Sequence, residues 1–526
     1  MSPSLVSRAS LELAWKRVKL DRPRRSFITH PYVFDWIEPD LSGWFHTIEN
    51  ELEQGYAPQD CLPCNRPKGN WMVRPGSILD LLDLKDETVL NAIIGSHYER
   101  IFNTLRWSQG TCDLAYQLTG KFNEVEWIRS GFLVWKEWRE KSLSKLSQNV
   151  KFVLMTDIAG FYENIDLQKL QSELGPLFSE PKMLHLLMKL LNRWAYASGK
   201  GIPQGYSASD ILAKIYLNPV DQSLRNLGFI YLRYVDDIRI FCVDERQAKK
   251  ALLQLTELLR YRGLVIQTAK TRILSTEEAR KKIDGVTPVI DSFEAKLREE
   301  LADLYKETGP YATLGDIDKI LESHTDDPTP DVLELAFREH FLEQRRQFDQ
   351  TLFHYLLNRL GKARSPVAKT YCIKMLSTHP EETEHILRYL ETQQLDISEI
   401  DLILDYASSE DAIYDYQLYE IVGWFFRCGS FPEKLVYLCR LWATDKNRDS
   451  WLRSYCLAVL GESGDQSDLE MIQRAYATVN SGIEKADIVT ALRRMEIGRR
   501  NSFLGRVKED GFLPRCAVRY VQQSHV

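Results

Sequence analysis

Acidic residues stand at two places where apolar, strand-like runs are interrupted. Asp157 lies near the end of VKFVLMTDI (150–158), and Asp236 and Asp237 lie in the middle of FIYLRYVDDIRIFC (229–242). An unpaired charge out of water costs several kcal/mol, so carboxylates in such runs need a partner. Carboxylate oxygens are the ligands that hard divalent cations prefer. The two places therefore predict a divalent metal site at the ends of strands.

The elements that position these acids are predicted from the period of the pattern. Apolar residues alternate with other residues on both sides of Asp236 and Asp237, as in a half-buried strand. Two strands joined by an Asp-Asp turn would form a hairpin that carries both carboxylates at an exposed tip. A turn that merely favours Asp is the alternative. Asp166, which precedes LQKLQSEL, is interpreted as a helix cap.

A glycine-containing loop separates the two acidic places. The segment GIPQG (201–205) is followed by an amphipathic pattern that predicts a long helix over 207–224. Glycines allow the backbone of such a loop to approach a flat ligand closely. Taken alone, the segment predicts no more than a turn before a helix.

The order and spacing of these segments resemble the palm of reverse transcriptases. DIAGFYENI resembles motif A of that family, GIPQG motif B, YVDD motif C, and GLVIQTAKTRIL (263–274) the strand of motif D. Residues 66–95, with a basic pair, resemble part of the fingers. The resemblance covers about residues 66–274. It implies an α+β right-hand polymerase fold with fingers and palm, the reverse transcriptase fold.

The resemblance also implies the activity, which is RNA-directed DNA polymerisation by nucleotidyl transfer from dNTPs. Two Mg²⁺ ions, with Mn²⁺ as an alternative, neutralise charge on the attacking and leaving oxygens in such a reaction. Tyr162 takes the position of an aromatic residue that blocks a ribose 2′-hydroxyl, so DNA is the expected product. By resemblance, the metal ligands are Asp157, Asp236, Asp237 and the carbonyl of Ile158, a possible proton donor to pyrophosphate is Lys270, and the dNTP contacts are Lys68, Arg74, Ile158, Tyr162, Gln204 and Gly205.

The texture of the chain changes near residue 285, after which the pattern is almost wholly helical. Amphipathic segments of about 10 to 15 residues alternate with short turns. This pattern predicts an all-α domain of HEAT-like repeats in place of the usual thumb. A non-repeating helical bundle is the alternative. The expected domains are an N-terminal basic segment with fingers (1–150), a palm (151–285) and a helical repeat domain (286–526).

Composition limits the kind of protein this is. The chain has 526 residues, 44% of them hydrophobic, and a net charge of -6, which excludes a uniformly basic nucleic-acid coat protein. Residues 8–25 hold seven Lys and Arg, which form either a phosphate-contacting face or a solvated basic helix. Nine scattered cysteines predict free thiols. The chain shows neither a signal peptide nor a membrane helix, so a cytoplasmic protein without a membrane partner is expected.

The helical half, together with the N-terminal segment and RPG in the fingers, resembles bacterial defence-associated and abortive-infection reverse transcriptases. That resemblance implies an antiphage role and homo-oligomers. It implies DNA synthesis that is untemplated or guided by a dedicated non-coding RNA, primed by a 3′-hydroxyl or by a tyrosine of the protein. Two alternatives stay open: an RNA-binding scaffold that recruits a partner through its helices, and a mobile-element reverse transcriptase that lacks its endonuclease.

Overall fold

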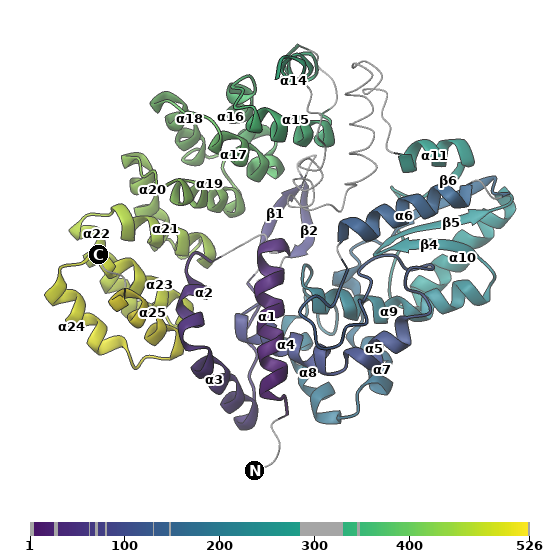
Figure 1. Ribbon diagram of the computed structural model, residues 1–526, viewed down its shortest axis with the longest axis horizontal. Helices are drawn as coiled ribbons and strands as arrows, with labels where there is room; N and C mark the ends of the chain where they lie inside the picture. The colour runs from purple at the N-terminus through teal and green to yellow at the C-terminus, as the bar shows by residue number, and fades with distance from the viewer. Residues whose placement is uncertain are drawn as a thin grey trace. The chain divides into compact units, whose positions relative to one another are not determined.

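The structure is a computed structural model, and it describes residues 5–25, 30–62, 64–68, 72–78, 82–129, 131–146, 149–284, 330–343 and 348–523. The chain divides into two compact units (Figure 1). The first unit comprises Met1–Phe27, Glu51–Pro63 and Pro75–Pro328, and the second comprises Ile28–Asn50, Cys64–Arg74 and Thr329–Val526. The predicted boundary at residue 285 lies outside the described residues, and the predicted division into three domains stays a prediction.

The first unit contains a four-stranded antiparallel sheet in the order β4-β5-β3-β6. Its strands are β3 (Phe152–Asp157), β4 (Ile230–Tyr234), β5 (Asp237–Cys242) and β6 (Arg272–Ser275). The strands predicted at 150–158, from an apolar strand-like run, and within 229–242, from alternation, are therefore confirmed. Their apolar side chains are buried because α10 packs on β3 and β5, while α6 packs on β4 and β5 (Figure 1).

The predicted Asp-Asp turn is wrong by one residue. Tyr234 pairs with Asp237, so the two residues of the turn are Val235 and Asp236, and Asp237 already belongs to β5. Val235 has φ 54°, a left-handed conformation that is unusual for a β-branched residue. Neither aspartate lies at an exposed tip, because both are partly buried.

The predicted motif D strand is also shorter than expected. Within residues 263–274, Ile266 makes an isolated antiparallel bridge to Ile158 and a turn follows. Regular strand pairing then resumes in β6, which lies beside β3. The interruption places Lys270 in the turn and not on a strand.

Helices surround this sheet in the first unit. Several begin at an aspartate whose side chain accepts a hydrogen bond from a backbone N–H of the first turn, as Asp83, Asp166 and Asp244 do. The predicted capping role of Asp166 is thereby confirmed. The helices are α1 (Arg8–Arg25), α4 (Leu84–Ser96), α5 (Tyr98–Leu105), α6 (Gly131–Leu146), α7 (Leu167–Leu174), α8 (Pro181–Trp194), α9 (Ser207–Asn226), α10 (Glu245–Tyr261) and α11 (Thr276–Asp284).

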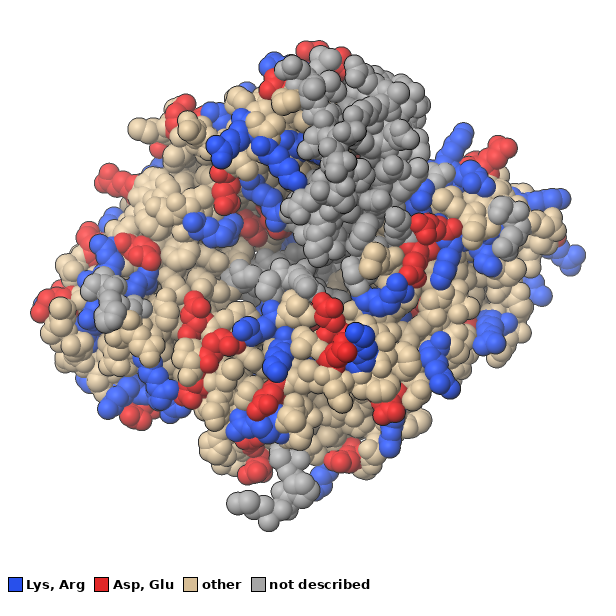
Figure 2. Space-filling view, in the orientation of Figure 1, with Lys and Arg blue, Asp and Glu red and all other residues tan. Residues whose placement is uncertain are grey.

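Helix α1 carries the basic segment, but two of its arginines point inward. Arg17 is 1% exposed, donates hydrogen bonds to backbone carbonyls at residues 122 and 124, and lies 4.1 Å from the centroid of the Trp127 ring. Arg22 pairs with Glu87 at 2.7 Å. These two side chains therefore serve packing and cannot belong to a phosphate-contacting face. On the face shown in Figure 2, basic and acidic side chains are interspersed over the described residues.

The second unit is built mainly of helices, joined by two short segments from the N-terminal part of the chain. Strand β1 (Asn65–Lys68) lies in this unit and pairs with β2 (Met72–Ile78), of which the residues up to Arg74 belong to the same unit. Tyr32, at the start of α2, packs against Phe426, Tyr520 and Arg493 of the C-terminal helices. The second unit therefore draws its core from distant parts of the sequence.

The C-terminal helices contact one another in a regular order. Helices α15, α17, α19, α21, α23 and α25 form one series in which each contacts the next, and α16, α18 and α20 form another. From the N-terminal part of the chain the second unit also contains α2 (Val33–Ile37) and most of α3 (Leu41–Gln54). Its C-terminal helices are α14 (Pro330–Phe337), α15 (Gln350–Lys362), α16 (Lys369–Thr378), α17 (Thr383–Glu391), α18 (Ile397–Ala407), α19 (Asp415–Cys428), α20 (Glu433–Thr444), α21 (Ser450–Ser463), α22 (Gln466–Ala475), α23 (Gly482–Ala491), α24 (Ile497–Val507) and α25 (Phe512–Gln523).

Two further expectations from composition are met. All nine cysteines are free thiols. None of the described helices carries an apolar stretch that would span a lipid bilayer.

Candidate active site

Three carboxylates converge at one end of the four-stranded sheet. Asp157 is the last residue of β3 and lies directly opposite Asp237, the first residue of β5. Asp236 precedes Asp237 in the hairpin turn, and its backbone carbonyl accepts a hydrogen bond of 3.1 Å from Ile158 N–H. The structure thus brings together the three acids that sequence reasoning singled out, and it places Ile158 beside them.

Burial and mutual repulsion perturb this cluster. Burial, followed by the negative charges of Asp157 and Asp237, raises the pKa of Asp236 to about 8. Burial and the charge of Asp157 raise the pKa of Asp237 to about 6. Carboxylates that share a buried site cannot all ionise at low cost unless positive charge is supplied.

The donor set fits a divalent cation. Oδ1 of Asp157 is buried and has no hydrogen-bond partner among the described residues. A buried acceptor without a hydrogen bond destabilises the folded state unless a ligand binds it. Three carboxylates and a nearby backbone carbonyl offer the oxygen ligands that Mg²⁺ and Mn²⁺ prefer. The predicted metal ligands therefore have the donor atoms that a divalent cation needs, while their role as ligands stays a prediction.

Lys270 supplies one positive charge to the cluster. Its ammonium group contacts Oδ2 of Asp157, and its side chain is 58% exposed. Burial lowers the pKa of Lys270, but the hydrogen bond and charge of Asp157 raise it, and the raising prevails. The turn is held in place by the Gln267 N–H, which donates to the Asp157 carbonyl at 2.7 Å. Lys270 is therefore protonated and lies at the site, as a proton donor must.

The motif B loop is attached to the segment that follows Asp157. Ile202 N–H donates to the carbonyl of Tyr162 at 3.0 Å, and Gly201 N–H donates to the carbonyl of Ile165 at 2.9 Å. Gly201 has φ 97°, and a Cβ there would lie 3.2 Å from a backbone oxygen, so this turn requires glycine. Gln204 and Gly205 lie in the same loop and are partly buried.

Tyr162 is fixed by a hydrogen bond to helix α9. Its hydroxyl donates to Oδ1 of Asp210 at 2.6 Å, and its side chain is buried. Burial and the nearby Asp210 carboxylate hold the pKa of Tyr162 well above its usual value, so the phenol is neutral. The ring therefore has a fixed orientation, while its predicted contact with a ribose stays a prediction.

The two predicted triphosphate contacts lie on the small sheet. Lys68 is the last residue of β1, and Arg74 lies within β2. The side chains of both residues are outside the described part of the structure. Their predicted contact with the triphosphate stays a prediction.

A buried ion network behind the motif C hairpin was missed by sequence reasoning. Arg233 binds both oxygens of Asp221, at 2.6 and 3.1 Å, and also contacts Asp113 at 2.9 Å. Lys214 pairs with the same oxygen of Asp113 at 2.6 Å. All four side chains are at most 3% exposed. The sequence feature that could have indicated this network is Arg233 itself, a charged residue within an otherwise apolar strand pattern.

This network reaches the turn between β4 and β5 directly. Nη1 of Arg233 donates to the carbonyl of Val235 at 2.9 Å. Val235 is the residue with the left-handed backbone, and such a conformation persists only where surrounding contacts determine it. Arg233 is thus a positioning residue that holds the turn on which Asp236 is presented.

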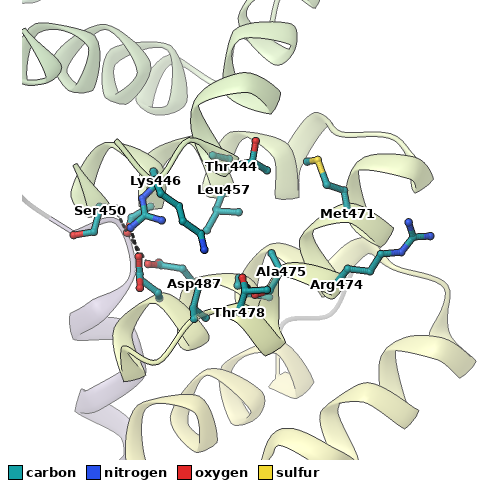
Figure 3. Close-up of a pocket in the computed structure, with 15 residues that line it drawn as sticks. Thr444, Lys446, Ser450, Leu457, Met471, Arg474, Ala475, Thr478 and Asp487 are labelled. Atoms are coloured by element: carbon teal, nitrogen blue, oxygen red, sulfur yellow. Dashed lines mark hydrogen bonds and ion pairs between the residues drawn. The ribbon is translucent and has the colours of Figure 1, made fainter. Parts of the chain in front are cut away.

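A pocket in the second unit offers a different kind of site (Figure 3). Its volume is about 340 Å³, and it is lined by residues from helices α20 to α23 and the turns between them. Arg453 pairs there with Glu484, and Ser454 donates to Asp487 at 2.6 Å. The other oxygen of Asp487 lies 2.8 Å from Nε2 of His30, so each of the two acidic side chains lies beside a basic one and the pocket differs from the carboxylate cluster of the sheet.

Residues 98–298 match the family model described as reverse transcriptase (RNA-dependent DNA polymerase). The match indicates a reverse transcriptase domain in this part of the chain, and the enzyme class of such domains is RNA-directed DNA polymerase, a nucleotidyltransferase. The matched range contains the three aspartates, the motif B loop and Lys270. Reverse transcriptase domains generally use divalent metal ions such as Mg²⁺.

Solved structures similar to the chain include two telomerases. Apo telomerase from Candida tropicalis has 12% sequence identity and a TM-score of 0.29, with 69% of this chain and 60% of that chain covered. Telomerase from Candida albicans in complex with a TWJ fragment of telomeric RNA has 13% identity and a TM-score of 0.29, with 79% and 73% covered. The chain thus spans less than two thirds of the first of these proteins. A search of curated proteins found no match.

We expect Arg233→Met to destabilise the first unit by about 3–5 kcal/mol, because it leaves Asp221 buried without its cationic partner and removes one of the two cations that contact Asp113. Chemical denaturation followed by tryptophan fluorescence measures the change. Arg246→Met, on the exposed face of α10, is the matched control and should stay within about 0.5 kcal/mol of wild type. A loss below about 1 kcal/mol for Arg233→Met would show that the network does not hold the hairpin.

We expect Asp236→Asn to stabilise the metal-free protein as pH rises. The folded-state pKa of Asp236 is raised to about 8, above its value in the unfolded chain. The folded wild type therefore loses stability as pH increases toward that value, because folding then opposes ionisation of this carboxyl group. In EDTA, the variant should gain on the order of 1–3 kcal/mol over wild type near pH 9 and little near pH 5.

Thermal unfolding at both pH values, with and without Mg²⁺, measures this effect. Mg²⁺ should narrow the gap because it stabilises the ionised wild-type cluster. A gap that is independent of pH would contradict the proposed repulsion.

Proposed function

We propose that this chain is a DNA polymerase that acts in bacterial antiphage defence by adding nucleotides from dNTPs to a 3′-hydroxyl or a protein primer. The observation that carries the proposal is the convergence of Asp157, Asp236 and Asp237 at one end of the sheet. Folding alone gives no reason to bury three mutually repelling acids. A site for nucleotidyl transfer does.

The chain's own residues have distinct parts in this proposal. Asp157, Asp236 and Asp237, with the carbonyl of Ile158, would hold two divalent ions, Mg²⁺ or Mn²⁺. When bound, such ions neutralise charge on the attacking and leaving oxygens of a phosphoryl transfer. Lys270, released from Asp157 when that carboxylate is otherwise neutralised, would carry its proton toward the leaving pyrophosphate.

The choice of substrate is assigned to residues near the motif B loop. Tyr162, whose orientation is fixed by Asp210, would exclude a 2′-hydroxyl and so favour dNTPs. Gln204 and Gly205 would border the incoming base and template. Lys68 and Arg74 would bind the triphosphate from the fingers, as a point charge and a planar fork.

The defence role rests on the resemblance of the motifs and on the helical character of the second unit. Two ordered series of helix contacts are what stacked HEAT-like repeats would produce, because each repeat contacts its neighbours. We assign to these helices the assembly of homo-oligomers in the cytoplasm. A non-coding RNA that templates synthesis is the partner proposed for the polymerase.

The test compares phage protection by wild type and by Asp236→Ala/Asp237→Ala in cells, together with sequencing of the nucleic acid that co-purifies with each protein. We expect the variant to lose both protection and its DNA product. A product complementary to a bound RNA identifies a template, and a product without such a match indicates untemplated synthesis.

Asp401→Ala/Asp411→Ala removes two exposed acids from the second unit and is the matched control. It should keep protection and product. If the palm variant protects as well as wild type and neither protein carries DNA, the chain acts as an RNA-binding scaffold and the polymerase proposal is wrong.

A further inference from the structure

Two histidines and a glutamate form a compact cluster in the second unit. His354 lies on α15, Glu382 ends the short helix η6 (Pro380–Glu382), and His385 lies in the first turn of α17. One ligand atom from each side chain lies within 4.8 Å of the others. Helices α15 and α17 pack against each other, so the cluster joins two neighbouring elements.

The carboxylate of Glu382 is the centre of this cluster. Its Oε2 lies 2.5 Å from Nε2 of His354 and 3.7 Å from Nδ1 of His385. Its Oε1 accepts a hydrogen bond of 2.6 Å from Gln350. Glu382 is fully buried. A glutamate oriented in this way by a second polar side chain is typical of carboxylates that bind metal ions.

His385 is the unexplained member. Both of its ring nitrogens are buried, and neither has a hydrogen-bond partner among the described residues. A buried polar ring without a partner is unfavourable unless a ligand binds it.

We propose that His354, Glu382 and His385 bind a divalent transition-metal ion, with Zn²⁺ as the best match. Two imidazoles and one carboxylate form a ligand set that suits Zn²⁺, whereas Mg²⁺ prefers oxygen ligands and keeps several waters. Three protein ligands leave a fourth position for water. This site lies in the second unit and uses none of the palm acids.

The geometry of the cluster requires one imidazole ring to turn before both can bind one ion, and it places an acidic side chain beside the nearby arginine. The two imidazole rings stack with centroids 3.5 Å apart and planes 12° from parallel, so one ring must turn about its Cβ–Cγ bond to direct its lone pair at the same ion. The positive charge of Arg66 near His385 is offset by Glu384, which lies 3.5 Å from it. The bound ion would link α15 to the start of α17 and stabilise this part of the helical unit.

The test measures zinc in the full-length protein after EDTA treatment, incubation with Zn²⁺ in excess Mg²⁺, and removal of free metal. Wild type should retain about one Zn²⁺ per chain, as expected for a three-ligand site. Both His385→Gln and Glu382→Gln should retain little. His46→Gln, an exposed histidine of the same unit, and Asp236→Ala/Asp237→Ala in the palm should retain as much as wild type.

A second measurement does not depend on whether these variants fold. Zn²⁺ added to EDTA-treated wild type should raise its unfolding temperature in a concentration-dependent way, because the ion binds the folded state. His46→Gln should respond in the same way. Wild type that retains no zinc, or whose unfolding temperature is unchanged by Zn²⁺, would overturn the proposal and leave the cluster as a hydrogen-bonded His–Glu pair beside a stacked neutral ring.

Discussion

Electrostatic repulsion among one buried and two partly buried carboxylates is the constraint around which the first unit is arranged. Asp157 and Asp237 face each other across two paired strands, and Asp236 adds a third charge from the adjoining turn. Repulsion at this range in a low-dielectric environment is severe unless positive charge is present. The ammonium group of Lys270 supplies part of that charge, and the fit of the remaining oxygen ligands to divalent cations accounts for the rest. The fold therefore keeps a charge imbalance at the place where the reaction is proposed to occur.

Such a cluster needs a rigid support, and the support is itself ionic. Behind the hairpin, Arg233 is held by Asp113 and Asp221 and donates to the carbonyl of Val235. Breaking a buried ion pair on one side costs far more than removing a surface pair. The network therefore holds Val235 in its unfavourable left-handed backbone conformation and resists rearrangement of the turn. The motif B loop adds a second support through its hydrogen bonds to the segment that follows Asp157.

Patterns of short range were the most predictable part of this structure. A continuous apolar run located β3, alternating apolar residues located β4 and β5, and the order of the motifs located the three aspartates. The turn was misplaced because hairpin register depends on cross-strand pairing, which alternation does not specify. The inward positions of Arg17 and Arg22 were missed because a run of charges does not reveal which helix face is buried. The cluster around Glu382 was missed because one of its ligands, His354, is distant in sequence and only the fold brings it close.

We propose that the converged carboxylates make the first unit a nucleotidyltransferase that uses deoxynucleotides. The most direct measurement is incorporation of labelled dNTPs or rNTPs into acid-insoluble product by purified full-length protein with Mg²⁺ or Mn²⁺, comparing wild type with Asp157→Asn. Wild type should incorporate dNTPs in preference to rNTPs, and the variant should lose about 1,000-fold or more of this activity, the effect of several kcal/mol of lost transition-state stabilisation. Equal incorporation by both proteins would show that the carboxylates do not catalyse nucleotidyl transfer.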